Sequence, residues 1–65
     1  MKQYQSYSHN THTYGVIFSD LEKAKDHTQY LSAICKCRYD VTDRETHGII
    51  ATYECGKVIY DSTGV

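Results

Sequence analysis

The periodicity of the chain changes at residues 35–42, which run Cys35-Lys36-Cys37-Arg38-Tyr39-Asp40-Val41-Thr42. In this stretch Cys, Cys, Tyr and Val alternate with Lys, Arg, Asp and Thr, and a period of two is typical of a strand with one buried face. Before it, apolar residues recur every three or four positions. The stretch therefore marks the point where a helix is followed by a sheet.

An amphipathic helix is predicted over residues 20–34, directly before this strand. Its apolar stripe has spacings of three and four and consists of Leu21, Ala24, Thr28, Leu31, Ile34 and Cys35. Ser19 and Glu22 have the spacing of a capping box, in which the serine hydroxyl and the glutamate carboxylate each accept a helix N–H. We therefore expect the helix to begin directly after Ser19.

Two more strands are predicted after residue 42. Residues 49–54 alternate between apolar and polar side chains, and the polar residues 43–48 before them have the composition of a turn. Cys55-Gly56 then interrupts the alternation before the apolar run 58–60, and glycine supplies the positive φ that a tight hairpin needs. The second half of the chain is thus expected to form a three-stranded meander.

The chain before the helix contains one apolar run and one polar segment. Residues 14–18, Tyr-Gly-Val-Ile-Phe, have the β-branched and aromatic composition of a buried strand. Residues 1–13 have no aliphatic residue beyond the initial Met, so we expect a tail or an edge strand there. If Asn10-Thr11 lies at a turn, Tyr7 pairs with Tyr14 across a hairpin.

These segments predict one small α+β domain over residues 14–61 with the order β-α-β-β-β. One helix would pack on one face of a mostly antiparallel sheet, with an extra N-terminal edge strand from residues 1–13 as an alternative to a tail. The strand-helix-strand connection predicts parallel strands, and residues 62–65 are expected to fray. A chain of 65 residues buries only about 60% of its unfolded surface, so we expect marginal stability.

The register of the strands is predicted by matching apolar with apolar side chains. The last hairpin would pair Tyr53 with Val58, Ala51 with Tyr60 and Glu54 with Lys57. The first would pair Val41 with Ile49, Tyr39 with Ala51 and Cys37 with Tyr53. The face expected under the helix then consists of Cys37, Tyr39, Val41, Ile49, Ala51, Tyr53, Val58 and Tyr60.

The same register brings the three cysteines to one end of the sheet. Together with His12, Cys35, Cys37 and Cys55 would then supply the thiolates and the imidazole of a tetrahedral zinc site. However, Cys-x-Cys is not the usual spacing of a structural zinc site, and free cysteines are commonly small buried apolar residues. We therefore favour reduced thiols without a metal and keep zinc as the alternative cofactor.

Composition and charge argue against several classes of function. The net charge is −1 and the basic residues are dispersed, so no electrostatic footprint for duplex nucleic acid is present. No apolar run is long enough to cross a bilayer, and the polar first residues lack the core of a signal peptide, so we expect a cytoplasmic protein without a membrane partner. A domain of this size rarely encloses a substrate pocket, so we assign no catalytic residue and expect no enzyme activity.

The function expected from these observations is docking on another protein. The face opposite the helix would carry Ile50 and Ile59 as an apolar patch beside Lys36 and Arg38. This predicts a small non-catalytic binding or regulatory module whose sheet face or edge binds a protein partner or a second copy in a homodimer. Alternatives are a zinc-binding protein and, third, a single-strand nucleic-acid binder that uses Tyr39 and Tyr53.

Overall fold

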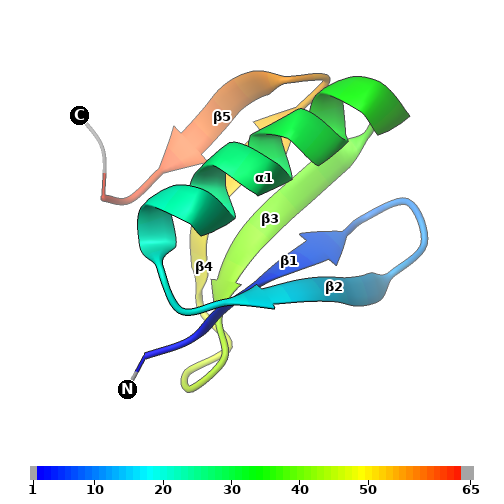
Figure 1. The fold of residues 1–65 in the computed structure, drawn as a ribbon. Coiled ribbons are helices and arrows are strands. Elements are labelled where there is room, and N and C mark those ends of the chain that lie inside the picture. The colour runs from blue at the N-terminus through cyan, green and yellow to red at the C-terminus, as the bar shows by residue number, and fades with distance from the viewer. Residues whose placement is uncertain (1, 64–65) are drawn as a thin grey trace.

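The computed structural model describes residues 2–63 as a five-stranded antiparallel sheet with one helix packed on one face (Figure 1). The elements in chain order are β1 (Tyr4–Ser8), β2 (Thr13–Phe18), α1 (Leu21–Cys35), β3 (Arg38–Asp43), β4 (Ile49–Glu54) and β5 (Lys57–Asp61). The predicted α+β class is confirmed, with an additional N-terminal strand. Of residues 62–65, which we expected to fray, Gly64 and Val65 lie outside the described residues, whereas Ser62 donates hydrogen bonds from its backbone N–H and its hydroxyl to the carbonyl of Ile50.

The strand order is β2-β1-β3-β4-β5, which places the polar N-terminal strand inside the sheet. β1 pairs antiparallel with both β2 and β3, so β2 and β3 run parallel, as the connection through α1 predicts, but with β1 between them. The expectation of a tail or an edge strand at residues 1–13 is therefore wrong. The expectation of a buried strand at residues 14–18 is also wrong, because β1 displaces β2 to the edge, where most of its residues are exposed.

The N-terminal hairpin itself forms as its aromatic residues suggested. Tyr7 pairs with Tyr14, and the centroids of their rings lie 5.0 Å apart. β2 contains a bulge, because Gly15 and Val16 together lie opposite Ser6. A Cβ atom on Gly15 would lie only 2.6 Å from the Oγ atom of Ser6, so a larger residue would require the Ser6 hydroxyl to move.

The helix begins one residue later than the capping box predicted. Asp20 is the N-cap, and its Oδ1 accepts hydrogen bonds from the backbone N–H groups of Glu22 at 2.9 Å and Lys23 at 3.4 Å. Asp can cap as well as Ser, and here the carboxylate also stabilises the positive end of the helix dipole. The helix ends at Lys36, whose left-handed conformation (φ 52°) terminates it and directs its N–H to the carbonyl of Ser32.

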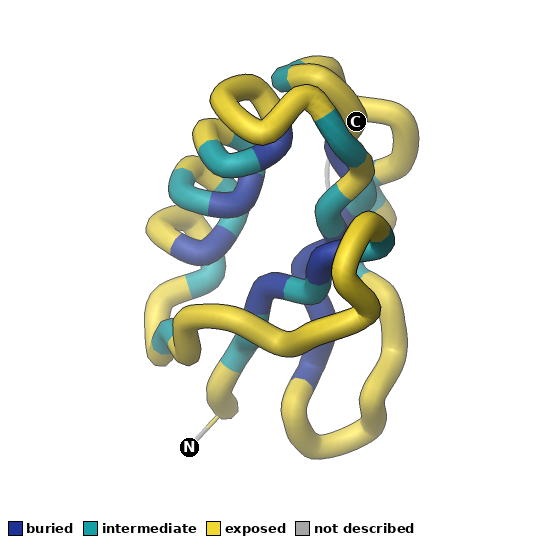
Figure 2. Tube along the Cα trace, turned by 90° about the vertical axis from the view of Figure 1, so that its right-hand side faces the viewer, coloured by how far each residue is buried: buried dark blue, intermediate teal, exposed yellow. Residues whose placement is uncertain are grey.

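The core lies where α1 faces the middle of the sheet (Figure 2). It consists of Ala24, Val41, Ala51 and Tyr53, with Tyr4, Phe18, Leu21 and Ile50 packed against it. The helix contributes mainly small side chains to this contact, Ala24, Thr28 and Ser32, while Ile34 is exposed. The predicted apolar stripe is thus only partly used, and its C-terminal part does not enter the core.

The predicted register between β3 and β4 is wrong by two residues. Tyr39 pairs with Tyr53 and Val41 with Ala51, and a bulge at Ile50 then places Ile49 opposite Thr42. The turn decides this register: the Asp43 N–H donates to the Gly48 carbonyl, and the Asp43 carboxylate accepts the N–H groups of two turn residues, Glu45 and Thr46. Ile49, which was expected under the helix, is consequently exposed on the other face.

The predicted register between β4 and β5 is correct only next to the turn. Tyr53 pairs with Val58 and Glu54 with Lys57, as expected, but a bulge at Ile59 then places Tyr60 opposite Thr52. Tyr60 therefore lies on the face without the helix, not in the core. Asp61 takes the position expected for Tyr60, opposite Ala51, and forms an ion pair of 2.7 Å with Lys25 of the helix.

Candidate functional site

One face of the sheet carries no helix, and strand pairing shows which side chains share it. Directly opposite residues in neighbouring strands point to the same face. Successive pairs across β2, β1, β3, β4 and β5 define a row of Tyr14, Tyr7, Asp40, Thr52 and Tyr60. We call the face that contains this row the open face. It has aromatic rings at both edges and hydrogen-bonding groups in the middle.

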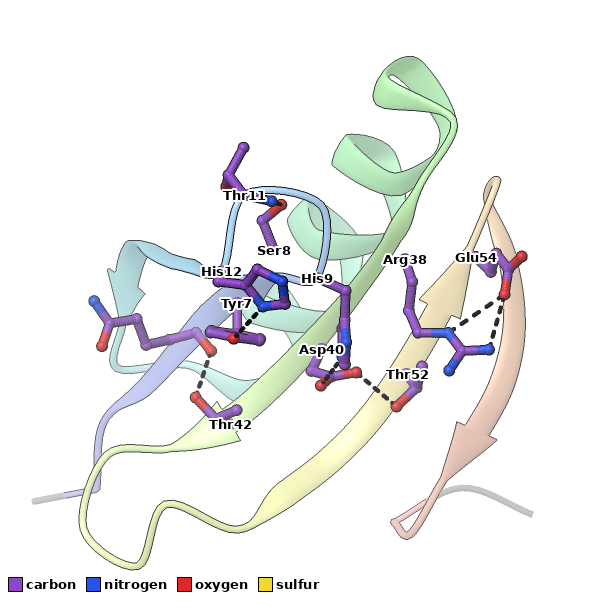
Figure 3. A network of polar contacts seen from close by, with 11 residues as sticks. Tyr7, Ser8, His9, Thr11, His12, Arg38, Asp40, Thr42, Thr52 and Glu54 are labelled. Atoms are coloured by element: carbon purple, nitrogen blue, oxygen red, sulfur yellow. Dashed lines mark hydrogen bonds and ion pairs between the residues drawn. The ribbon is translucent and has the colours of Figure 1, made fainter.

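A hydrogen-bond network centred on Asp40 stabilises the middle of the open face (Figure 3). One oxygen of the Asp40 carboxylate lies 2.6 Å from Nε2 of His9, and the other accepts the hydroxyl of Thr52 at 2.8 Å. The Asp40 residue is only 2% exposed although it lies on a face without a helix. These contacts compensate for the burial of a carboxylate and connect the turn after β1 to β3 and β4.

Tyr7 connects this network to the edge of the sheet. Its hydroxyl lies 3.2 Å from Nδ1 of His12, in the turn between β1 and β2. Its ring contacts the ring of His9 edge-on at 5.3 Å and the ring of Tyr14 at 5.0 Å. The edge strand β2 is therefore held in place through aromatic contacts from β1, which the Asp40 network in turn anchors to β3.

Sequence reasoning did not identify this network. Asp40 followed the alternating pattern of an exposed strand residue, and His9 lies 31 positions away in a segment that was expected to be a tail or an edge. The one detectable signal was the possible pairing of Tyr7 with Tyr14, which predicted the hairpin but not its contact with β3.

The edge strand β2 combines exposed apolar side chains with an absence of charge. Tyr14, Val16 and Ile17 are all about half exposed, and residues 3–19 contain no Asp, Glu, Lys or Arg. The opposite edge strand, β5, also has exposed apolar side chains, but Lys57 and Asp61 stand at its two ends. Charged residues at an edge are a common protection against pairing with other chains, and β2 lacks it.

The four residues predicted to form the docking patch do not form one surface. Ile50 is partly buried and packs against the core, because the bulge in β4 removes it from the expected alternation. Lys36 is not in a strand but ends the helix. Arg38 remains exposed and pairs with Glu54, with 3.0 Å between its Nη2 and the carboxylate, and Ile59 is exposed on the edge strand β5.

The three thiols lie at the same end of the sheet, but His12 is not with them. Burial raises the pKa of Cys37, and the neighbouring Cys35 and Cys55 raise it further. The ring of His12 instead contacts Tyr7. Within residues 2–63, no group of three or more His, Cys, Asp or Glu side chains is arranged to hold a metal ion, so the Cys₃His arrangement is not formed.

The two tyrosines considered for base stacking face the helix. Tyr53 is part of the buried core, where burial raises the pKa of its hydroxyl. Tyr39 lies directly opposite Tyr53 and is partly buried; its hydroxyl donates to Sγ of Cys35 at 3.7 Å, and this hydrogen bond raises its pKa. Neither ring is presented on the open face.

No protein-family model, curated protein or solved structure matches this chain. Over the part of the chain that the structure describes, no helix has the length and apolar character needed to cross a membrane. Function is therefore inferred from the geometry of the sheet and its edges.

Proposed function

We propose that this chain is a small docking module that binds through the edge strand β2, and that its partner is a second copy of the same chain. The observation that carries the proposal is the uncharged edge with half-exposed Tyr14, Val16 and Ile17. The activity is binding, and it involves no chemical step. The expected complex is a dimer with a continuous sheet across the two β2 strands.

Edge strands bind other strands because their outer backbone N–H and C=O groups have no neighbour within the sheet. β2 has six residues, so it offers a pairing length that is normal for a strand. Its side chains add apolar surface on both sides of the backbone. The bulge at Gly15 and Val16 interrupts the regular pairing of β2, but Ile17 and Phe18 beyond it are regularly paired with β1.

A second copy is favoured by charge. Two β2 strands related by a two-fold axis place identical segments side by side, and no like charges oppose each other because the whole hairpin is uncharged apart from its histidines. A strongly charged partner would find no opposite charge on residues 3–19. An apolar, uncharged strand is the complement of this surface, and the chain itself supplies one.

The contacts behind β2 favour binding without rearrangement. The ring of Tyr7 in β1 packs against the ring of Tyr14 in β2, and His9 in the turn between these strands contacts the buried Asp40 in β3. An edge that is held in place by such contacts loses little conformational entropy when it binds. The Asp40 network thus has a supporting role at some distance from the proposed contact.

Matched lysine substitutions on the two edges test the proposal. Val16 in β2 is 50% exposed and Val58 in β5 is 55% exposed, so Val16→Lys and Val58→Lys introduce the same charge at sites of similar exposure. We expect the wild-type chain and Val58→Lys to form a dimer, and Val16→Lys to raise the dimer dissociation constant more than tenfold. Sedimentation equilibrium gives this constant, and circular dichroism verifies that each variant is folded.

Three outcomes would contradict the proposal. Loss of the dimer in Val58→Lys but not in Val16→Lys would assign the contact to β5. A wild-type chain that stays monomeric at all concentrations would exclude a second copy as the partner. Salt-sensitive binding of a labelled single-stranded oligonucleotide, lost on Tyr14→Ala in a monomeric protein, would assign nucleic-acid binding to the open face instead.

A further inference from the structure

Two cysteines, Cys35 and Cys37, lie at the junction between α1 and β3 and are separated by one residue. Cys35 is the last helical residue, and Lys36 adopts the left-handed conformation that ends the helix. The backbone N–H of Cys37 then donates to the carbonyl of Ser32 at 3.3 Å, which holds the residue after the turn against the helix end. The side chains of Cys35 and Cys37 are near enough for Cys35 to raise the pKa of the Cys37 thiol.

The two thiols differ in their surroundings. Cys35 is exposed, and its sulfur accepts the hydroxyl of Tyr39 at 3.7 Å. Cys37 is partly buried, and burial is the main reason why its pKa is raised. Because Cys35 is exposed, an external reagent reaches it first. The thiolate is the reactive form of a cysteine, and the raised pKa of Cys37 favours its protonated form, so Cys37 reacts second.

We propose that Cys35 and Cys37 form a thiol–disulfide exchange site for small disulfides such as glutathione disulfide. This inference is independent of the docking proposed for β2, which lies on another part of the sheet. The product is a Cys35–Cys37 disulfide at the end of the helix, and the reverse reaction with excess thiol restores the two free cysteines.

The reaction proceeds in two exchange steps. The Cys35 thiolate attacks one sulfur of glutathione disulfide, the S–S bond breaks, and one glutathione leaves and takes up the proton that Cys35 lost. Cys37 then loses its proton and attacks Sγ of Cys35 in the mixed disulfide, which releases the second glutathione. The protein loses two electrons and two protons, and one glutathione disulfide is reduced to two molecules of glutathione.

Cys55 is the nearest alternative partner for Cys37 and supplies the control. Its backbone N–H lies 3.4 Å from the carbonyl of Cys37, so the two residues are neighbours across the strands. Its thiol, however, belongs to the exposed turn between β4 and β5. Of the two neighbouring thiols, Cys35 is only two residues from Cys37 in the chain, and it raises the pKa of Cys37 more than Cys55 does.

Mass spectrometry of the intact full chain tests the site. Reduced Cys55→Ser protein is mixed with glutathione disulfide, quenched with acid at intervals and weighed. We expect the final product to have lost two hydrogen atoms, with the disulfide located between Cys35 and Cys37 by peptide mapping. Adding Cys37→Ser should stop the reaction at a mixed disulfide that carries one glutathione on Cys35.

The single variant Cys35→Ser provides the opposite control, because it retains Cys37 and Cys55. We expect no intramolecular disulfide in this variant. Formation of a Cys37–Cys55 disulfide there, or a Cys55→Ser protein that accumulates only mixed disulfides or does not react, would overturn the proposal. Thermal melting of each reduced variant shows that the fold is intact before oxidation.

Discussion

Two buried hydroxyl groups at the interface between helix and sheet have no hydrogen-bond partner within residues 2–63, Oγ of Ser6 in β1 and Oγ1 of Thr28 in α1. An unsatisfied hydroxyl in an apolar environment costs about 1–3 kcal/mol of stability. Both are small side chains on the surfaces that α1 and the sheet present to each other. Their size allows the helix to approach the sheet, while their polarity weakens the core.

Replacement of Thr28 by valine is therefore expected to stabilise the protein. Thr28→Val keeps the shape and the helix propensity of the side chain but removes the unpaired hydroxyl, so the free energy of unfolding should rise by about 1 kcal/mol. Thr52→Val is the control, because it removes a hydroxyl that donates to the buried Asp40 and should lower stability by about 2 kcal/mol. Urea unfolding measures both, and a destabilised Thr28→Val would contradict the expectation.

The lowered pKa of Asp43 predicts that the free energy of unfolding decreases at acidic pH. The backbone N–H of Glu45, then the side chain of Lys2 and the N–H of Thr46, lower the pKa of this carboxyl in the folded state. Its contribution is therefore present above the ordinary aspartate pKa of about 3.9 and is lost as the pH falls through the lower folded value. Asp43→Asn should flatten the loss of stability below about pH 4, measured by urea unfolding across acidic pH. If Asp43→Asn loses stability at acidic pH to the same extent as the wild type, Asp43 does not contribute to this pH dependence.

At the N-terminus of α1, two adjacent residues are candidates for the N-cap, and the structure shows which of them caps the helix. Both Ser19 and Asp20 are good N-cap residues by type. Only Asp20 accepts hydrogen bonds from the first turn, and Ser19 is an exposed residue between β2 and the helix. The helix therefore depends on the side chain of Asp20.

Alanine substitutions at these neighbouring positions distinguish the two caps. Asp20→Ala should lower the free energy of unfolding by about 1 kcal/mol, since two backbone N–H groups lose their acceptor and the helix dipole loses a nearby negative charge. Ser19→Ala should change it by less than about 0.5 kcal/mol, as is usual for an exposed residue. Thermal and urea unfolding provide both values. Equal losses in the two variants would indicate a shared cap.

For the whole molecule, the balance between buried and exposed apolar side chains is unusual. The buried apolar core consists of two alanines, one valine and one tyrosine. Larger apolar side chains remain exposed on both edge strands and on the helix, among them Val16, Ile17, Ile34, Val58 and Ile59. A fold with so little buried apolar area gains relatively more from any contact that covers this surface.

Stability is therefore expected to depend on protein concentration. Because a dimer is favoured over unfolded chains by mass action, a hundredfold rise in concentration should stabilise the wild-type dimer by about 2.7 kcal/mol. The melting temperature of the wild type and of Val58→Lys should rise over this range, whereas that of Val16→Lys should stay constant. Calorimetry at several concentrations measures the effect. A constant melting temperature in all three proteins would contradict association through β2.

Local patterns in the sequence were sufficient to predict most of the elements of this fold. The helix over residues 20–34, the strand over residues 49–54 and the turn at Cys55-Gly56 appear within one residue of their predicted positions, whereas the strand predicted over residues 35–42 begins three residues later, at Arg38. Helical and strand periodicity arise from the backbone geometry of neighbouring residues, so a single segment contains the information. The pairing of Tyr7 with Tyr14 was predictable for the same reason, because a short turn joins them.

Only the tertiary structure decided which strand lies at the edge, the register between strands and the network around Asp40. The insertion of β1 between β2 and β3, and the contact between His9 and Asp40, join segments that are far apart in the chain. The bulges at Ile50 and Ile59 change the face of single residues, which alternation cannot reveal. Local periodicity specifies each segment, but the surface that a segment exposes depends on which other segments pair with it.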